Sequence, residues 1–178
     1  MQRMCRLRVP DPRSIALGTG LWLALAVALG ACDRPKAPVN GIGGFVLAKT
    51  TLSTVARQGT AQCFDSGGHT NCLIIAQQSI AGRTPQMQLE FASNQPNAVL
   101  RRIIMDIPGC VLDETRAWFQ ERLGKPNRSD DAGALWQQKY MVMSLRVTGP
   151  SRCQVIAVDP VDEANVTQLL EAHEASPP

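Results

Sequence analysis

The segment Cys63-Phe64-Asp65-Ser66-Gly67-Gly68-His69-Thr70-Asn71-Cys72 carries the clearest structural signal in the chain. Two adjacent glycines are typical of a two-residue hairpin turn, because both central positions of a type I′ turn need a positive φ. A hairpin centred on this turn pairs Ser66 with His69 and, further out, Cys63 with Cys72. The two cysteines fall on a non-hydrogen-bonded rung, where Cα atoms lie about 4.5 Å apart, a spacing that a disulfide tolerates. The sequence therefore predicts an antiparallel hairpin closed by a Cys63–Cys72 disulfide.

Cys110 and Cys153 are then left to form a second disulfide, once Cys5 in the leader and Cys32 at the lipidation site, both described below, are set aside. Four cysteines allow three connectivities, and an oxidising compartment favours pairing of all four. The alternative is a copper or zinc site in which Cys63, His69 and Cys72 are ligands. Since no CxxC or HxxxH spacing supports a metal site, we expect two disulfides and no metal or other cofactor.

Short alternating segments, typical of half-buried strands, continue on either side of this hairpin. Residues 86–91 alternate apolar and polar side chains, and residues 99–107 return after the turn at 94–97. Residues 140–148 and 153–158 form a third hairpin around Gly149-Pro150-Ser151. An antiparallel sheet built from hairpins is therefore expected.

Helices are fewer and short. The clearest covers 112–123, with acidic residues near its start and Gly124 after its end, as the helix dipole and helix termination favour. Of its adjacent aromatics Trp118 and Phe119, only one can point to the centre of the core. Shorter helices are predicted over 51–58, ending at Gly59, and over 161–172. The predicted fold class is α+β: an antiparallel sheet of hairpins packed by two or three short helices, with a possible duplicated helix-then-strands unit and two disulfides.

The N-terminal segment has the features of a secretory signal peptide. Four arginines precede an apolar run from Ile15 to Ala31, and small residues stand before the expected cleavage site. Leu29-Gly30-Ala31-Cys32 resembles the lipobox of bacterial lipoproteins, which implies that Cys32 carries a diacylglyceryl group and an N-acyl chain such as palmitate. An uncleaved membrane helix is the alternative, because the run approaches the length of a span. Asp33 resembles a signal that retains lipoproteins in the inner membrane. We expect a lipid-anchored protein on the periplasmic face of an envelope membrane, with the choice of membrane open.

Removal of the leader changes the charge and the domain boundaries. The leader holds four of the 18 basic residues and one of the 15 acidic residues, so the mature chain carries 14 of each. A neutral domain gives no reason to expect nucleic-acid binding, and Arg101-Arg102 is typical of a solvated strand edge. The predicted parts are a signal peptide (1–31), the lipidated cysteine with a flexible tether (32–44), one α+β domain (45–174) and a disordered tail (175–178).

Arg122-Leu123-Gly124-Lys125-Pro126 resembles the end of the helix in small envelope lipoproteins of the SmpA/BamE type. In that family the helix ends in a Leu-Gly-x-Pro turn before a sheet. The resemblance covers about a fifth of the mature chain, and this chain departs from the family in having more strands and four cysteines. It implies an accessory role in envelope assembly.

Catalytic signals are weak. Asp65, Ser66 and His69 invite comparison with a hydrolase triad, but adjacent strand residues point to opposite faces of a sheet, so Asp65 and Ser66 diverge. A turn explains the segment equally well. No phosphate loop, nucleophile elbow or dinucleotide fingerprint is present. The expectation is that the protein is not an enzyme.

Trp136, Tyr140 and Arg146 are the candidates for a binding surface, since Trp, Tyr and Arg are favoured in interface hot spots. Trp136 and Tyr140 are expected on the strand face opposite Met141 to Val147, unless a helix covers that face. The predicted function is that of a non-catalytic protein-binding or envelope-assembly accessory factor, with an envelope protein as its partner. Alternatives are a ligand-binding or inhibitory module, whose Gly67-Gly68 tip would enter a partner's cleft, and a hydrolase using Ser66, His69 and Asp65.

Overall fold

A computed structural model describes residues 41–76 and 78–174 of the chain. Its elements in chain order are β1 (Gly41–Ile42), β2 (Phe45–Val46), α1 (Leu52–Ala56), β3 (Gln62–Ser66), β4 (His69–Ile75), β5 (Gln86–Phe91), β6 (Leu100–Pro108), α2 (Leu112–Leu123), β7 (Arg128–Ser129), β8 (Gly133–Gln138), β9 (Met141–Gly149), β10 (Arg152–Val158) and α3 (Glu163–Glu174). The predicted α+β class is confirmed. No helix among these residues is long and apolar enough to cross a membrane.

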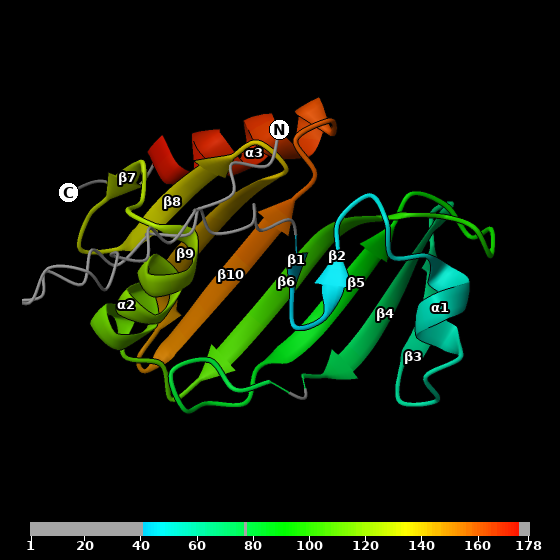
Figure 1. Cartoon of the computed structure of the whole chain (residues 1–178), viewed down its shortest axis with the longest axis horizontal. Coiled ribbons are helices and arrows are strands. Elements are labelled where there is room, and N and C mark those ends of the chain that lie inside the picture. The colour runs from blue at the N-terminus through cyan, green and yellow to red at the C-terminus, as the bar shows by residue number, and fades with distance from the viewer. Residues whose placement is uncertain (1–40, 77, 175–178) are drawn as a thin grey trace, which may run out of the picture. The chain divides into compact units, whose positions relative to one another are not determined.

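Eight strands form one antiparallel sheet in the order β3-β4-β5-β6-β10-β9-β8-β7 (Figure 1). The first half of the sheet, β3 to β6, is a meander that follows α1, and the second half, β7 to β10, is a meander that follows α2. The two halves join where their last strands, β6 and β10, pair antiparallel. The order of one helix followed by four strands therefore occurs twice. The last strand of each half, β6 or β10, is central in the sheet, and the first, β3 or β7, is at an edge.

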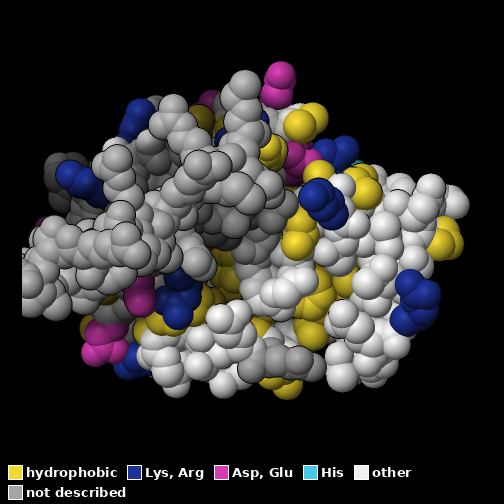
Figure 2. All heavy atoms as spheres, viewed as in Figure 1, with side chains coloured by type: hydrophobic (Ala, Val, Ile, Leu, Met, Phe, Trp, Pro, Cys, Tyr) yellow, Lys and Arg dark blue, Asp and Glu magenta, His cyan; other side chains and the backbone are white. Residues whose placement is uncertain are grey.

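Side chains alternate between two faces of this sheet, which we call the inner face and the outer face. The inner face carries Leu89, Met105, Val155 and their alternating neighbours, which are fully buried. The β1–β2 hairpin, α1 and α2 cover it and share its hydrophobic core (Figure 1). In Figure 2, which views this side, Lys and Arg side chains of the described residues lie apart from one another rather than in one basic patch. The outer face points the other way and is treated below.

The hairpin register predicted from Gly67-Gly68 is confirmed. Ser66 pairs with His69 and Cys63 with Cys72, and both glycines have positive φ, at 59° and 92°. The two cysteines form a disulfide with a Cα–Cα distance of 4.0 Å, close to the spacing of a non-hydrogen-bonded rung. The register of this turn therefore predicted correctly which two cysteines, nine residues apart in the sequence, form the disulfide.

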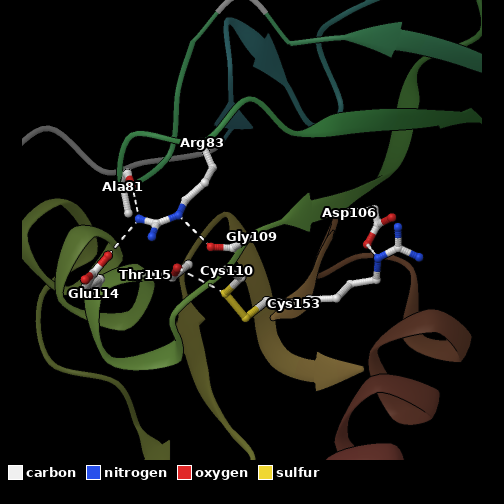
Figure 3. Close-up of a disulfide and its surroundings, with 9 residues drawn as sticks. Ala81, Arg83, Asp106, Gly109, Cys110, Glu114, Thr115 and Cys153 are labelled. Carbon is white, nitrogen blue, oxygen red and sulfur yellow. Dashed lines mark hydrogen bonds and ion pairs between the residues drawn. A yellow bond between two sulfur atoms is a disulfide. The ribbon is translucent and has the colours of Figure 1, made fainter. Parts of the chain in front are cut away.

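The second predicted disulfide, Cys110–Cys153, is also confirmed and joins the start of β10 to the turn before α2 (Figure 3). Arg83 reinforces this corner. Its guanidinium donates to the carbonyl oxygens of Ala81 and Gly109, and it pairs with Glu114 at 2.7 Å. One side chain thus links the β4–β5 connection to the first turn of α2.

All three predicted helices are present, but only the bounds of the second agree with the structure. The predicted helix at 112–123 is confirmed as α2, with Phe119 in the core and Trp118 at its border beneath the Arg122 guanidinium, 3.7 Å away. The first helix is shorter than the predicted 51–58, because α1 ends at Ala56. The last begins at Glu163, two residues later than predicted, since Asp159 and Asp162 form a turn before it.

The predicted tether over 32–44 overlaps the fold at its end. Residues 41–46 form the β1–β2 hairpin, and Ile42 is buried in the core with Phe45. Two positive-φ glycines, Gly43 and Gly44, make the turn, so glycines taken as a sign of flexibility serve a tight hairpin. Residues 32–40 and the predicted tail at 175–178 lie outside the described residues, as does the signal peptide.

Candidate functional site

The outer face of the first half-sheet carries a regular array of side chains. Cross-strand partners place Gln62, Leu73, Gln88 and Ile104 in one row across β3, β4, β5 and β6. The row toward the β3–β4 turn holds Phe64, Asn71, Glu90 and Arg102, and the row on the other side holds Ile75, Gln86 and Asp106. These residues alternate with the buried positions of the inner face, so the strand period of two directs all of them to the same side.

The β3 and β4 side of this array is exposed to solvent although it contains large aliphatic and aromatic side chains, whereas Arg102 at the β6 side donates to Asn165 of α3 at 3.4 Å. Ile75 is 72% exposed, Phe64 48% and Leu73 45%. They lie on two neighbouring strands and form one group rather than scattered exceptions. Contiguous exposed apolar surface on a folded domain marks an interaction site more often than single exposed residues do.

The outer face of the second half-sheet is covered in contrast. Leu135, Val142 and Val158, on β8, β9 and β10, are buried beneath Leu169 of α3, and Val166 and Leu170 pack beside them. In Figure 1, α3 lies across this half of the sheet. Among the described residues no helix lies over β3, β4 or β5 on the outer side, so the sheet is covered on both faces in one half and on one face in the other.

We call the uncovered outer surface of β3, β4, β5 and β6 the open face. A pocket of about 610 Å³ lies on it. Its lining joins aliphatic side chains to amides: Leu73, Ile75, Ile104, Gln62, Gln86, Gln88 and Gln154. Within the array, the Gln88 amide donates to Asn71 Oδ1 at 3.0 Å. Amide side chains both donate and accept hydrogen bonds, so the open face presents hydrogen-bonding groups interspersed with aliphatic side chains.

The charges on and beside the open face are paired. Arg102 Nη1 on β6 lies 3.8 Å from Glu90 Oε2 on β5. Arg152 Nε on β10 lies 3.5 Å from Asp106 Oδ1 on β6. The prediction that Arg101-Arg102 marks a strand edge is wrong, because β6 is central in the sheet and Arg101 pairs with Asp159 at 2.7 Å. The open face is therefore close to neutral and has no concentration of positive charge for a polyanion.

The predicted binding surface of Trp136, Tyr140 and Arg146 is not assembled. Trp136 is fully buried on the inner face, opposite Met143, where its indole N–H donates to the Gly124 carbonyl at 2.9 Å. Tyr140 lies exposed in the β8–β9 turn. The Arg146 guanidinium donates to the carbonyl of Ala172 and so holds the last turn of α3. The prediction failed because Trp136 shares a face with Met143 rather than opposing it, and α2 covers that face.

The triad residues are likewise kept apart. Asp65 Oδ1 accepts a hydrogen bond from the Thr70 hydroxyl at 2.9 Å on the inner side of the hairpin. Ser66 and His69 face each other on the other side. The metal alternative fails on its ligands, because the sulfurs of Cys63 and Cys72 are bonded to each other. Within residues 41–76 and 78–174, no group of three or more His, Cys, Asp or Glu side chains is placed to hold a metal ion.

The open face was missed by the sequence reasoning, although its residues were available. Gln86 and Gln88 were noted only as the polar half of an alternating strand, and Leu73 and Ile75 were not assigned. The signal was the apolar run Leu73-Ile74-Ile75, which places large aliphatic side chains on both faces of β4. Comparisons with family models, with curated proteins and with solved structures found no match.

Proposed function

We propose that this protein is a lipid-anchored, non-catalytic binding factor on the periplasmic face of a bacterial envelope membrane, and that the open face binds a protein partner. The observation that carries the proposal is the open face itself: Phe64, Leu73 and Ile75 exposed together on a sheet whose other half is covered. Leaving such side chains in water forgoes about 1.5 to 3 kcal/mol for each large aliphatic residue that could be buried.

The dimensions of the open face suit one segment of a partner protein rather than a whole domain surface. Four strands spaced about 4.8 Å apart and three rows spaced about 7 Å apart make a surface roughly 15 Å on each side. Its aliphatic side chains alternate with amides, and protein interfaces likewise combine apolar contacts with hydrogen bonds. Because its charges are paired, the open face supports a neutral protein surface as ligand and gives no support for nucleic acid.

The binding proposal predicts the effect of a double substitution, Leu73→Lys with Ile75→Lys. Binding would then remove two lysine side chains from water, which weakens binding. The amount of cross-linked partner recovered from intact envelopes should therefore fall at least tenfold. Both side chains are exposed in the isolated protein, so the free energy of unfolding should change by no more than about 1 kcal/mol. Quantitative mass spectrometry of the cross-linked fraction and urea unfolding measure the two effects.

Tyr140→Ala is the matched control, since Tyr140 is 42% exposed but lies in the β8–β9 turn, away from the open face. This variant should recover the partner as well as the wild type does. If the double variant kept full recovery, or if Tyr140→Ala removed it, the open face would not be the binding surface.

The anchoring part of the proposal rests on the resemblance of Leu29-Gly30-Ala31-Cys32 to a lipobox, which lies outside the described residues. Cys32→Ser should abolish incorporation of labelled palmitate and should move the protein from the membrane fraction to the soluble periplasmic fraction or to an unprocessed precursor. Labelling that persists in this variant, or its presence in the membrane as a processed chain, would contradict an anchor at Cys32.

A further inference from the structure

We infer that the partner docks on the open face with an amphipathic α-helix, which lies beside α3 in the position that the second half-sheet gives to α3 itself. The inference rests on the proposed function and adds the secondary structure and chemistry of what is bound. It comes from a comparison of the two halves of this one sheet.

The first step is the internal repetition. Each half is a helix followed by a four-stranded meander, and the last strands of the two meanders pair at the centre of the sheet. In this arrangement β4, β5 and β6 take the places in the first half that β8, β9 and β10 take in the second. The outer faces of the two halves are therefore corresponding surfaces on one continuous sheet.

The second step is the occupant of the covered half. A helix, α3, buries the outer face of β8, β9 and β10 with Leu169 at the centre of the contact. The chain itself thus shows which element packs on this surface. The first half has a comparable aliphatic bed in Leu73, Ile75 and Ile104, with no helix over it among the described residues.

The third step is space. Packed helices lie about 8 to 10 Å apart, which is two strand spacings of about 4.8 Å. A helix beside α3, which packs on β9 and β10 and whose Asn165 accepts a hydrogen bond from Arg102 on β6, would lie over β5 and the part of β6 around Ile104. The open face extends for two more strands to β3, so the sheet is wide enough for a second helix.

The fourth step is the chemistry of the helix. Ile104 and Leu73 lie in one row with Gln88 between them and Gln62 beyond. A helix that fits this row has a narrow aliphatic stripe at positions i, i+3 or i+4 and i+7. On either side of the stripe it carries neutral hydrogen-bonding side chains for the glutamine amides. The glutamine amides distinguish this bed from that of α3, which is formed by Leu135, Val142 and Val158 together with the buried Ser144, and they give the open face its own selectivity.

Addition of a partner strand is the main competing mode, because β3 is an edge strand. A strand paired with β3 would extend the sheet but would leave Ile104 uncovered, since β6 lies three strand spacings, about 14 Å, from β3. A docked helix covers Leu73 and Ile104 together. The contact pattern of the partner therefore separates the two modes.

The test places the photo-crosslinker p-benzoylphenylalanine at position 73, 88 or 104 of the full-length chain, one position at a time, in intact envelopes. Mass spectrometry then identifies the partner residues attached from each position. We expect all three to label one partner segment, at residues separated by three, four or seven. A crosslinker in place of Asp113, whose exposed side chain lies on α2 on the other side of the sheet, should not label that segment.

The outcomes distinguish the two proposals. The helix inference would be overturned by labels at alternate residues of an extended segment, at scattered loops, or on a second copy of this chain. If the labelled extended segment or loops belong to a separate protein, the proposed binding function still holds. Absence of any product from all three positions would overturn both. A proline placed in the centre of the labelled segment should weaken binding of a synthetic peptide at least tenfold, whereas alanine on its solvent side should not.

Discussion

Replacing Trp136 with alanine is expected to lower the free energy of unfolding by about 3 to 5 kcal/mol, the range for loss of a large buried aromatic side chain. The indole is fully buried, lies 6.0 Å from the Phe119 ring and donates a hydrogen bond to the Gly124 carbonyl. Alanine leaves a cavity between β8 and α2 and removes that hydrogen bond. Urea unfolding followed by far-UV circular dichroism measures the loss.

Trp136→Phe separates packing from hydrogen bonding, since it keeps an aromatic ring but cannot donate to Gly124. This variant should lose less than Trp136→Ala does. Tyr140→Ala, four residues away in an exposed turn, should change stability by less than about 1 kcal/mol. A Trp136→Ala protein as stable as the wild type would show that the indole does not fill the space between β8 and α2.

Removing the Cys110–Cys153 disulfide should cost about 4 kcal/mol, because the bond closes a segment with a sequence separation of 43 and restricts the unfolded chain accordingly. The Cys110→Ala, Cys153→Ala variant tests this by urea unfolding under conditions that keep the other disulfide oxidised. Both sulfurs are buried at the corner tied by Arg83, so their loss also disturbs packing.

The Cys63→Ala, Cys72→Ala variant is the matched comparison. Its disulfide spans a separation of only nine, so loop closure predicts a smaller cost of about 2.5 kcal/mol. The hairpin also lies at the edge of the sheet, where Cys63 is exposed. Equal losses for the two variants, or a larger loss for the edge disulfide, would contradict the argument from loop length.

The features that could be predicted are those fixed by neighbours in the sequence. Two adjacent glycines allow one hairpin register, and that register places Cys63 opposite Cys72. The bounds of α2 follow from acidic residues at its start and Gly124 after its end. With one disulfide assigned, the other followed by elimination. For the hairpin and for α2 the deciding residues lie within about a dozen positions of one another.

The features that were missed depend on contacts between distant segments. The strand β8 lacks an alternating pattern, because Ala134, Leu135 and Trp136 are all buried. Ala134 and Trp136 lie on the face covered by α2, and Leu135 lies on the face covered by α3. A strand covered on both faces loses the period of two. A register shift between β5 and β6 places Leu100 in the core, although simple alternation from Ile103, Met105 and Ile107 would place Val99 there.

The open face shows the same limit for function. Alternation predicts that Leu73, Gln88 and Ile104 point away from the inner core, but it does not predict whether another layer covers them. That depends on where α3 packs, and α3 begins about 60 residues after Ile104 and about 90 residues after Leu73. Arg146 was similarly taken for a surface residue, whereas its partner is the last turn of that helix.

The order of strands in the sheet also has a consequence for how the chain assembles. Within the described sheet, every pair of neighbouring strands is consecutive in sequence except β6 and β10. Each meander can therefore form from a continuous stretch of sequence before the two meanders pair. Until β10 arrives, β6 is an unsatisfied edge with Ile103, Met105 and Ile107 beside it, and such an edge is prone to pair with other chains. The Cys110–Cys153 disulfide lies where β6 and β10 pair, so it ties together the two halves that only this strand pair joins.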